Sequence, residues 1–289
     1  MSGPTSTGVL DREFTMTPGE PPGGGPHALA VAVRYEWARL RTLRSTWFLL
    51  GAAVAVNAAV ASAVGAEIDS GDRKLDPAGV VTLLTGGAGT APRSLTALVL
   101  GIVGVLVIGQ DFRHGTLPST LCVSPRRGTV LAAKALVVSV WAAGAAVLAA
   151  GAAYLVGLAV LGDAWRPSLL GDGATPRALG GFVALVVLTA LVGLALGGVL
   201  RGVPAALAVL LLVPLALEPL AEAGLDSGGG EAARFMPFTA AHRMIAVSAQ
   251  DGGHAFVPLG PGAGGLVFAG YAAVLLLLAG IMLKARDAG

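Results

Sequence analysis

The stretch LGGFVALVVLTALVGLALGGVLRGVPAALAVLLLVPLAL, residues 179–217, contains a single charged residue, Arg201. A helix rises about 1.5 Å per residue, so about 20 apolar residues are needed to cross the hydrocarbon core of a bilayer. This stretch is long enough for two crossings. Pro204 suits the first turn of a new helix, because an N–H group would have no partner there. We therefore predict two membrane-spanning helices joined by a tight turn at Arg201.

The composition of the whole chain agrees with this interpretation. Its 289 residues are 55% hydrophobic and only 12% charged, with a mean hydropathy of +0.78. Soluble domains average about a quarter charged residues, because their surfaces face water. We predict an all-α, polytopic membrane protein with about six transmembrane helices. The predicted spans are near 47–66, 95–110 (beginning upstream around Ala91), 131–161, 179–200, 204–217 and 266–283.

The basic residues fall in alternate connections between these spans. They are Arg34, Arg39, Arg41 and Arg44, then Arg113, Arg126, Arg127 and Lys134, then Arg201, and finally Lys284 and Arg286. The other connections are mixed or acidic. Cytoplasmic loops carry an excess of Lys and Arg. We therefore predict a multi-pass protein of a bacterial-type plasma (inner) membrane, with both termini in the cytoplasm.

The residues before the first span divide into two parts. Residues 1–27 are rich in Gly, Pro, Ser and Thr, and we predict a disordered cytoplasmic tail. Residues 28–46 place Leu29, Val33, Trp37 and Leu40 at helical spacing, with Arg34 and Arg41 on the opposite side. Such a segment is expected to lie in the membrane interface as a helix of its own. The alternative is a basic flank that only sets topology. Residues 47–289 form the predicted transmembrane domain.

The connection between the second and third spans, GQDFRHGTLPSTLCVSPRRGT (109–129), contains its own helix signals. Gly115 permits a turn and Thr116 can cap a new helix. Leu117-Pro118 fits a first turn, and Ser124-Pro125 ends the helix, because a residue before Pro avoids the helical region. These signals predict a short cytoplasmic helix lying crosswise to the spans. An ordinary loop with topology-setting arginines is the alternative.

Three further features concern packing. Asn57, in the first span, is predicted to hydrogen-bond between helices, and Gly193 with Gly197 indicates close helix packing. The segments 215–224 and 234–239 are amphipathic or apolar but are broken by proline. They are predicted to be half-inserted on the outer face, with a solvated loop as the alternative.

Several kinds of chemistry are excluded by the residues present. None of the three lysines sits in a phosphate-binding loop, and all four histidines lie outside the spans, with no His-Glu-x-x-His motif. A single cysteine, Cys122, cannot form a cysteine metal cluster. No stretch has the density of Lys and Arg that nucleic-acid binding requires. We therefore expect no enzymatic activity, no cofactor, no metal and no nucleic-acid partner.

The central connection resembles a known family. The residues Gln110-Asp-Phe-Arg-His-Gly-Thr116, followed by Ser124-Pro-Arg-Arg-Gly128 and Ala133-Lys134, are similar to the pattern of ABC-2 type transporter permeases, the membrane subunits of ABC exporters. Arg34-Tyr-Glu-Trp37, Arg44-Ser-Thr-Trp47 and Arg234-Phe-Met-Pro-Phe-Thr-Ala240 add weaker likenesses. The resemblance covers the chain from about residue 28 to its end.

This resemblance implies a function and a set of partners. The crosswise helix would be a coupling helix that docks on a separate cytoplasmic ABC ATPase subunit, where ATP is hydrolysed. A second permease copy, identical or different, and membrane lipid would complete the exporter, which would move an amphipathic substrate. The implied ATPase-coupling residues are Asp111, Arg113, His114, Gly115, Thr116, Leu117, Leu121, Arg126 and Arg127. The interfacial helix would add Arg34, Glu36, Trp37 and Arg41. The alternatives are a non-transporting membrane scaffold or sensor and an ion-coupled secondary transporter.

Overall fold

The computed structural model describes residues 26–72, 75–87, 94–114, 127–162, 173–226, 231–247 and 257–285. Within these ranges the regular structure is helical and no strand is present. The elements are α1 (Pro26–Thr42), α2 (Arg44–Asp69), α3 (Pro77–Leu84), α4 (Leu95–His114), α6 (Arg127–Leu161), α7 (Ala174–Leu200), α8 (Val203–Leu212), the π-helix η2 (Val213–Leu217), α9 (Glu218–Asp226), the 3₁₀ helix η3 (Glu231–Phe235), α10 (Pro237–His242) and α11 (Pro261–Ala285).

Five helical stretches are long and apolar enough to cross a membrane. They are Arg44–Asp69, Gly128–Leu161, Ala174–Leu200, Val203–Gly224 and Pro261–Leu283. The apolar part of α4, Leu95–Asp111, is shorter. Large apolar side chains are also exposed along α6 and α11, for example Leu155 and Leu266, as expected for surfaces that face lipid. The chain is therefore built as a multi-pass membrane protein.

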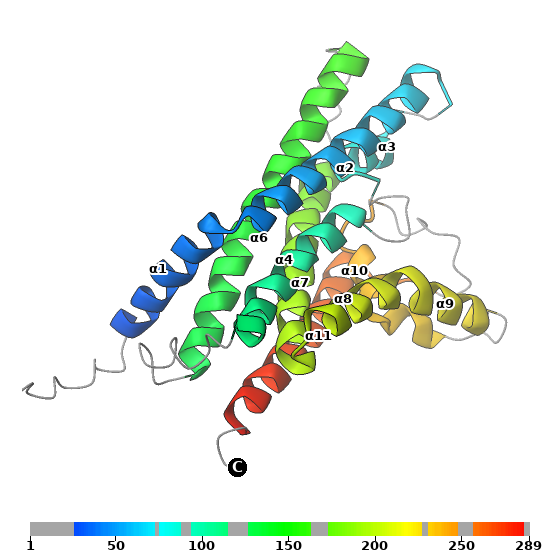
Figure 1. Ribbon diagram of the computed structural model, residues 1–289. Helices are drawn as coiled ribbons and strands as arrows, with labels where there is room; N and C mark the ends of the chain where they lie inside the picture. The colour runs from blue at the N-terminus through cyan, green and yellow to red at the C-terminus, as the bar shows by residue number, and fades with distance from the viewer. Residues whose placement is uncertain are drawn as a thin grey trace, which may run out of the picture.

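Helix α7 occupies the centre of the bundle and packs against α4, α6 and α11 (Figure 1). Its contact with α4 is backbone to backbone. A Cβ atom at Gly193 would overlap the carbonyl oxygen of Gly101, and one at Gly104 would overlap that of Ala190. Small residues allow this approach, which brings many van der Waals contacts into range. The predicted close packing around Gly193 and Gly197 is confirmed, and it lies within one chain.

Asn57 joins α2 to three other elements. Its Nδ2 donates to the carbonyl oxygens of Leu84 (3.2 Å) and Ala149 (2.7 Å), and its Oδ1 accepts from the Thr96 hydroxyl (3.2 Å). The side chain is completely buried. Because a buried amide must find partners, these bonds fix the positions of α3, α4 and α6 around α2. The predicted interhelical role of Asn57 is confirmed.

Helix α3 was not predicted as an element, because its residues belong to a stretch that was predicted to be an outside connection. Asp76 precedes it, and its carboxylate accepts a hydrogen bond of 2.7 Å from the Gly79 N–H. Pro77 occupies the first turn, where it needs no N–H partner. Val80 and Leu83 are completely buried. A capping residue followed by proline and an apolar run was therefore the available sequence signal.

The turn between α7 and α8 was predicted and is present. Arg201 adopts a left-handed conformation (φ 56°), and its N–H donates to the Gly197 carbonyl oxygen at 3.1 Å. Such a residue ends a helix and reverses the chain. Helix α8 begins directly at Val203, with Pro204 in its first turn.

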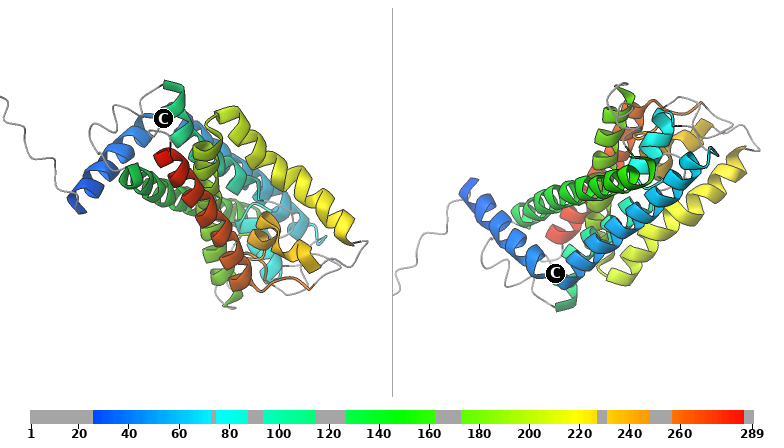
Figure 2. Two further views of the ribbon diagram at one scale, coloured as in Figure 1. Left: turned by 90° about the horizontal axis from the view of Figure 1, so that it is seen from below. Right: turned by 90° about the horizontal axis from the view of Figure 1, so that it is seen from above.

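The helix after this turn extends further than predicted. Through η2 it continues from α8 into α9, so the apolar stretch runs to Gly224 rather than stopping near Leu217. Figure 2 shows α8 and α9 as one long rod along an edge of the molecule. The local widening to a π-helix coincides with Pro214, which has no N–H to donate. The amphipathic segment 215–224 is therefore part of this helix rather than a separate element.

Candidate functional site

Four charged side chains from three helices meet at one end of the bundle. Lys134 of α6 places its Nζ 2.7 Å from Glu36 Oε1 of α1 and 2.9 Å from Asp111 Oδ2 of α4. Arg39 of α1 forms an ion pair with Oδ1 of the same aspartate. Glu36, Asp111 and Lys134 are only 1–3% exposed, whereas the Arg39 side chain is 21% exposed. We call these four residues the ion cluster.

The ion cluster has a balanced charge, with two carboxylates and two cations. Removing a charge from water is costly, and a buried ion persists only where opposite charges and hydrogen bonds compensate it. Here each of the two most buried ions, Asp111 and Lys134, contacts two opposite charges. The three helices are consequently held in one arrangement, since separating any of them would expose an uncompensated charge.

The ion cluster explains how α1 attaches to the bundle. Its buried face is formed by Glu36 and Leu40, with Val33 half-buried beside them. Trp37 shares the predicted apolar stripe with Val33 and Leu40, yet it is exposed. A buried glutamate therefore takes a place on the packed face of the helix because Lys134 lies opposite it. Helix α1 lies along the start of α6, to the lower left in Figure 1.

The structure brings together part of the predicted site. Asp111 and Glu36 belong to the ion cluster, while Arg34, Trp37 and Arg41 are exposed on α1. Arg113 and His114 lie in the last turn of α4, and Arg127 opens α6. The remaining predicted residues lie outside the described residues, as does the expected crosswise helix. These residues are Gly115, Thr116, Leu117, Leu121 and Arg126.

From the sequence, Arg39 was interpreted as a marker of topology, and Lys134 as a marker of topology and as part of the permease-like pattern. Neither residue was predicted to belong to a site. Lys134 lies almost two turns into α6, inside a long apolar helix. A cation in such a place needs a counter-charge, and this was the signal that could have identified it. Which carboxylate would supply that charge could not be read from the sequence, because Glu36 is 98 residues away.

A second polar cluster fixes the segment after α9. Glu218 Oε1 accepts from the Phe238 N–H, and its Oε2 accepts from the Thr239 N–H, both at 2.9 Å. The Thr239 hydroxyl lies 3.0 Å from Glu218 Oε2 and also contacts Glu222. Glu218 is buried, so it satisfies amides at the start of α10 that have no helical partner. Phe238 then packs on Phe268 of α11, with ring centroids 5.3 Å apart.

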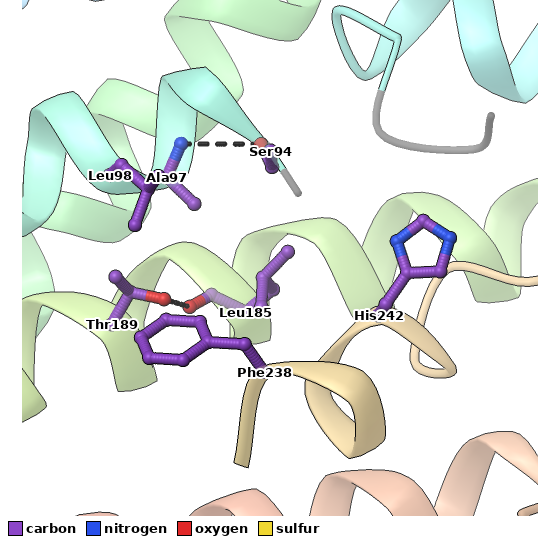
Figure 3. A pocket seen from close by; sticks show the side chains of 7 residues that line it. All are labelled: Ser94, Ala97, Leu98, Leu185, Thr189, Phe238 and His242. Atoms are coloured by element: carbon purple, nitrogen blue, oxygen red, sulfur yellow. Dashed lines mark hydrogen bonds between the residues drawn. The ribbon is translucent and has the colours of Figure 1, made fainter. Parts of the chain in front are cut away.

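A small recess lies near this second cluster (Figure 3). It is lined by Ser94, Ala97, Leu98, Leu185, Thr189, Phe238 and His242. It has room for about one water molecule. Its hydroxyl groups already have partners in their own segments, because Ser94 accepts from the Ala97 N–H and Thr189 donates to the Leu185 carbonyl oxygen. Because it holds only about one water molecule, the recess is too small for an organic substrate.

No family model matches the chain, and no curated protein matches it. Among the described residues, no group of three or more His, Cys, Asp or Glu side chains could hold a metal ion. In the described part of the chain, the ion cluster joins charged residues of three helices. Its ion pairs connect α1, α4 and α6 to one another.

Proposed function

We propose that this chain is the membrane subunit of an ATP-driven exporter of the ABC-2 permease type, with ATP hydrolysed on a separate cytoplasmic subunit. The observation that supports it most directly is the position of the ion cluster. Asp111 stands at the end of α4 and Lys134 near the start of α6, on either side of the connection that resembles the coupling segment of such permeases. The cluster therefore links both ends of that connection to α1.

The proposed mechanism uses this link. An ATPase that docks on residues 115–126 would push or pull on the adjacent ends of α4 and α6. Because Asp111 and Lys134 are paired with each other and with α1, the three helices would move together as one lever. A buried ion pair resists separation strongly, since parting it strands a charge in a poorly hydrated place. The motion would then reach the spans rather than dissipate in the connection.

The proposed topology has six crossings. The shorter α4 would join the five longer apolar stretches as a span. The end of α4, the start of α6 and the ends of α7 and α11 all lie in the lower half of Figure 1, as alternating crossings require. We assign this end to the cytoplasm because the basic connections belong to it. Two such permeases and two ATPase subunits would enclose a path for an amphipathic substrate.

Affinity purification of the full-length chain from its native membrane in mild detergent tests this proposal. We expect a stoichiometric ATPase subunit to co-purify. Leu121→Asp, within the proposed coupling segment, is expected to abolish its recovery. Leu75→Asp, an exposed leucine in the connection between α2 and α3, serves as the matched control and should leave the recovery unchanged.

Two outcomes would contradict the proposal. Repeated absence of an ATPase, under conditions that preserve other membrane complexes, would favour the scaffold function. Substrate flux in proteoliposomes that follows an ion gradient and needs no ATPase would favour a secondary transporter.

A further inference from the structure

Three arginines, Arg34 in the middle of α1 and Arg41 and Arg44 at its corner with α2, are left without an acidic partner among the described residues. Arg34, Arg41 and Arg44 are all exposed. Glu36 is the one acidic residue of α1, and it is already paired with Lys134, while Asp111 is shared by Lys134 and Arg39. The balanced ion cluster thus leaves a net positive surface on the side of α1 that faces away from the bundle.

Exposed aromatic side chains lie near these arginines along the chain. Tyr35 and Trp37 on α1, and Trp47 and Phe48 at the start of α2, are 37–78% exposed. The Trp47 Nε1 donates to the Arg41 carbonyl oxygen at 2.9 Å, which fixes the corner where the helix breaks at Leu43. Arg34 and Arg41 are two turns apart and therefore lie on the same side of α1.

The depth of this corner in a membrane follows from α2. Since α2 is apolar from Trp47 onward, its first turn marks the boundary between hydrocarbon and headgroups. Trp and Tyr gather at this boundary, because their rings are apolar and carry one polar group. The guanidinium group of Arg fits phosphate oxygens with two parallel hydrogen bonds.

We propose that Arg34, Arg41 and Arg44 bind the phosphate headgroups of anionic phospholipids, with Trp37 and Trp47 packed beside the upper acyl chains. The charge and the aromatic residues together favour lipid over an acidic protein, which would need no aromatic girdle. Bound lipid would hold the outer side of α1 while the ion cluster holds its inner side. This proposal requires only that the chain crosses a membrane, and it stands apart from the exporter function.

Quenching of tryptophan fluorescence by brominated lipid tests the proposal. The full-length chain carrying Trp141→Phe and Trp165→Phe retains only Trp37 and Trp47 as reporters. It is placed in two sets of vesicles with the same ratio of phosphatidylglycerol to phosphatidylcholine, and bromine is carried by one lipid or the other. We expect brominated phosphatidylglycerol to quench more than its share of the lipid predicts.

Matched variants make the test specific. Arg41→Gln is expected to lower the preference for phosphatidylglycerol about fivefold, the effect of roughly one basic residue at an anionic surface. Arg41→Lys should retain most of the preference. Arg201→Gln removes an exposed cation at the turn between α7 and α8 and should leave the preference unchanged.

Two results would contradict the proposed lipid site. If the chain with all three arginines intact is quenched by each brominated lipid only in proportion to that lipid's share of the vesicle, no anionic lipid gathers at the site. That result would leave an acidic protein as the partner. Equal losses from Arg41→Gln and Arg201→Gln would reveal a general charge effect and no site. Native mass spectrometry of the chain with all its tryptophans provides a second measurement, in which the count of retained phosphatidylglycerol molecules should fall in the variant with Arg34, Arg41 and Arg44 all replaced by Gln.

Discussion

At the scale of single residues, Lys134 carries a charge that is almost completely buried. Its side chain is 2% exposed and lies between two carboxylates of two different helices. A lysine stem can often bend towards water, but here the ammonium group is held inside the bundle by Glu36 and Asp111. The charge is therefore stable only while both neighbours stay in place, and this makes Lys134 a sensitive position for testing the ion cluster.

Replacing Lys134 by Met is expected to lower the free energy of unfolding by about 3–5 kcal/mol, because two carboxylates would then face a single partly exposed arginine. Unfolding in detergent mixtures, followed by circular dichroism, measures the change. The double variant Glu36→Leu/Lys134→Met keeps the Arg39–Asp111 pair balanced, and it should lose less than Lys134→Met alone. Arg41→Met, an exposed cation of α1, is the control and should change stability by less than about 1 kcal/mol. Equal losses in all three variants would contradict the role assigned to the ion cluster.

At the scale of elements, the contact between α4 and α7 holds these two helices at backbone distance. The two backbones touch near Gly101, Gly104 and Gly193, so no side chain separates them. Asn57 performs a comparable task between α2 and its neighbours by hydrogen bonds. Polar and small residues thus do what hydrophobic burial does in soluble proteins, because lipid chains solvate apolar side chains as well as another helix does.

Gly193→Ala is expected to destabilise the chain by about 1–3 kcal/mol, since its new methyl group would overlap the Gly101 carbonyl oxygen and force the helices apart. Gly144→Ala is the matched control, because a Cβ there meets no atom within 4 Å. That variant should be neutral or stabilised by up to about 1 kcal/mol through helix propensity. Unfolding in detergent mixtures, followed by circular dichroism, measures both variants. A Gly193→Ala variant with unchanged stability would refute the close contact of α4 with α7.

The attachment of α10 through Glu218 also belongs to this scale. Glu218→Leu removes the acceptor for two backbone N–H groups, so the start of α10 should open more readily. Hydrogen exchange at the Phe238 and Thr239 amides is expected to accelerate about tenfold, the equivalent of roughly one charge-assisted hydrogen bond. Glu231→Gln, which alters an exposed carboxylate paired with the half-buried Arg234, should leave that exchange unchanged. Unaltered exchange in Glu218→Leu would show that α10 is held by its apolar contacts alone.

At the scale of the whole molecule, the helices form a bundle whose two ends differ in kind. One end holds the ion cluster and the arginine corner. The other holds the capped α3 and the short α10. Figure 1 shows α6 running the full length between these ends, with α1 attached along its start. Cytoplasmic connections carry an excess of Lys and Arg. The arginines at the first end therefore lead to a prediction about the orientation of the chain in the membrane.

Cys122, the single cysteine of the chain, allows the orientation to be measured without mutation. We predict that an impermeant maleimide misses it in intact cells and labels it in inside-out membrane vesicles. A denatured sample of each preparation serves as the control for total reactivity. Labelling of Cys122 from outside intact cells would reverse the proposed topology and remove the connection 115–126 from reach of any cytoplasmic ATPase.

The spans could be predicted from the sequence because the property that defines them is local. A run such as 179–217 is apolar whatever its neighbours are, and Pro204 marks the start of the next helix by its own chemistry. The sequence also contained local signals for α3, a capping Asp76 followed by Pro77 and an apolar run, and for the extension of α8 into α9, the amphipathic segment 215–224. An outside connection was nevertheless expected at both places. Hydropathy by itself does not say whether a short apolar helix is packed inside the bundle or lies in a loop.

That this chain is helical and crosses a membrane several times could be predicted from its sequence, since each apolar run must satisfy its backbone groups internally in lipid. The sequence also placed Asn57 and the glycines of α7 at helix contacts. Which charges pair with one another depends on the three-dimensional fold. Lys134 required a counter-charge, but the attraction between charges depends on distance in space. The fold brings Glu36 and Asp111 to Lys134 from two other helices, and Arg39 pairs with the other oxygen of Asp111.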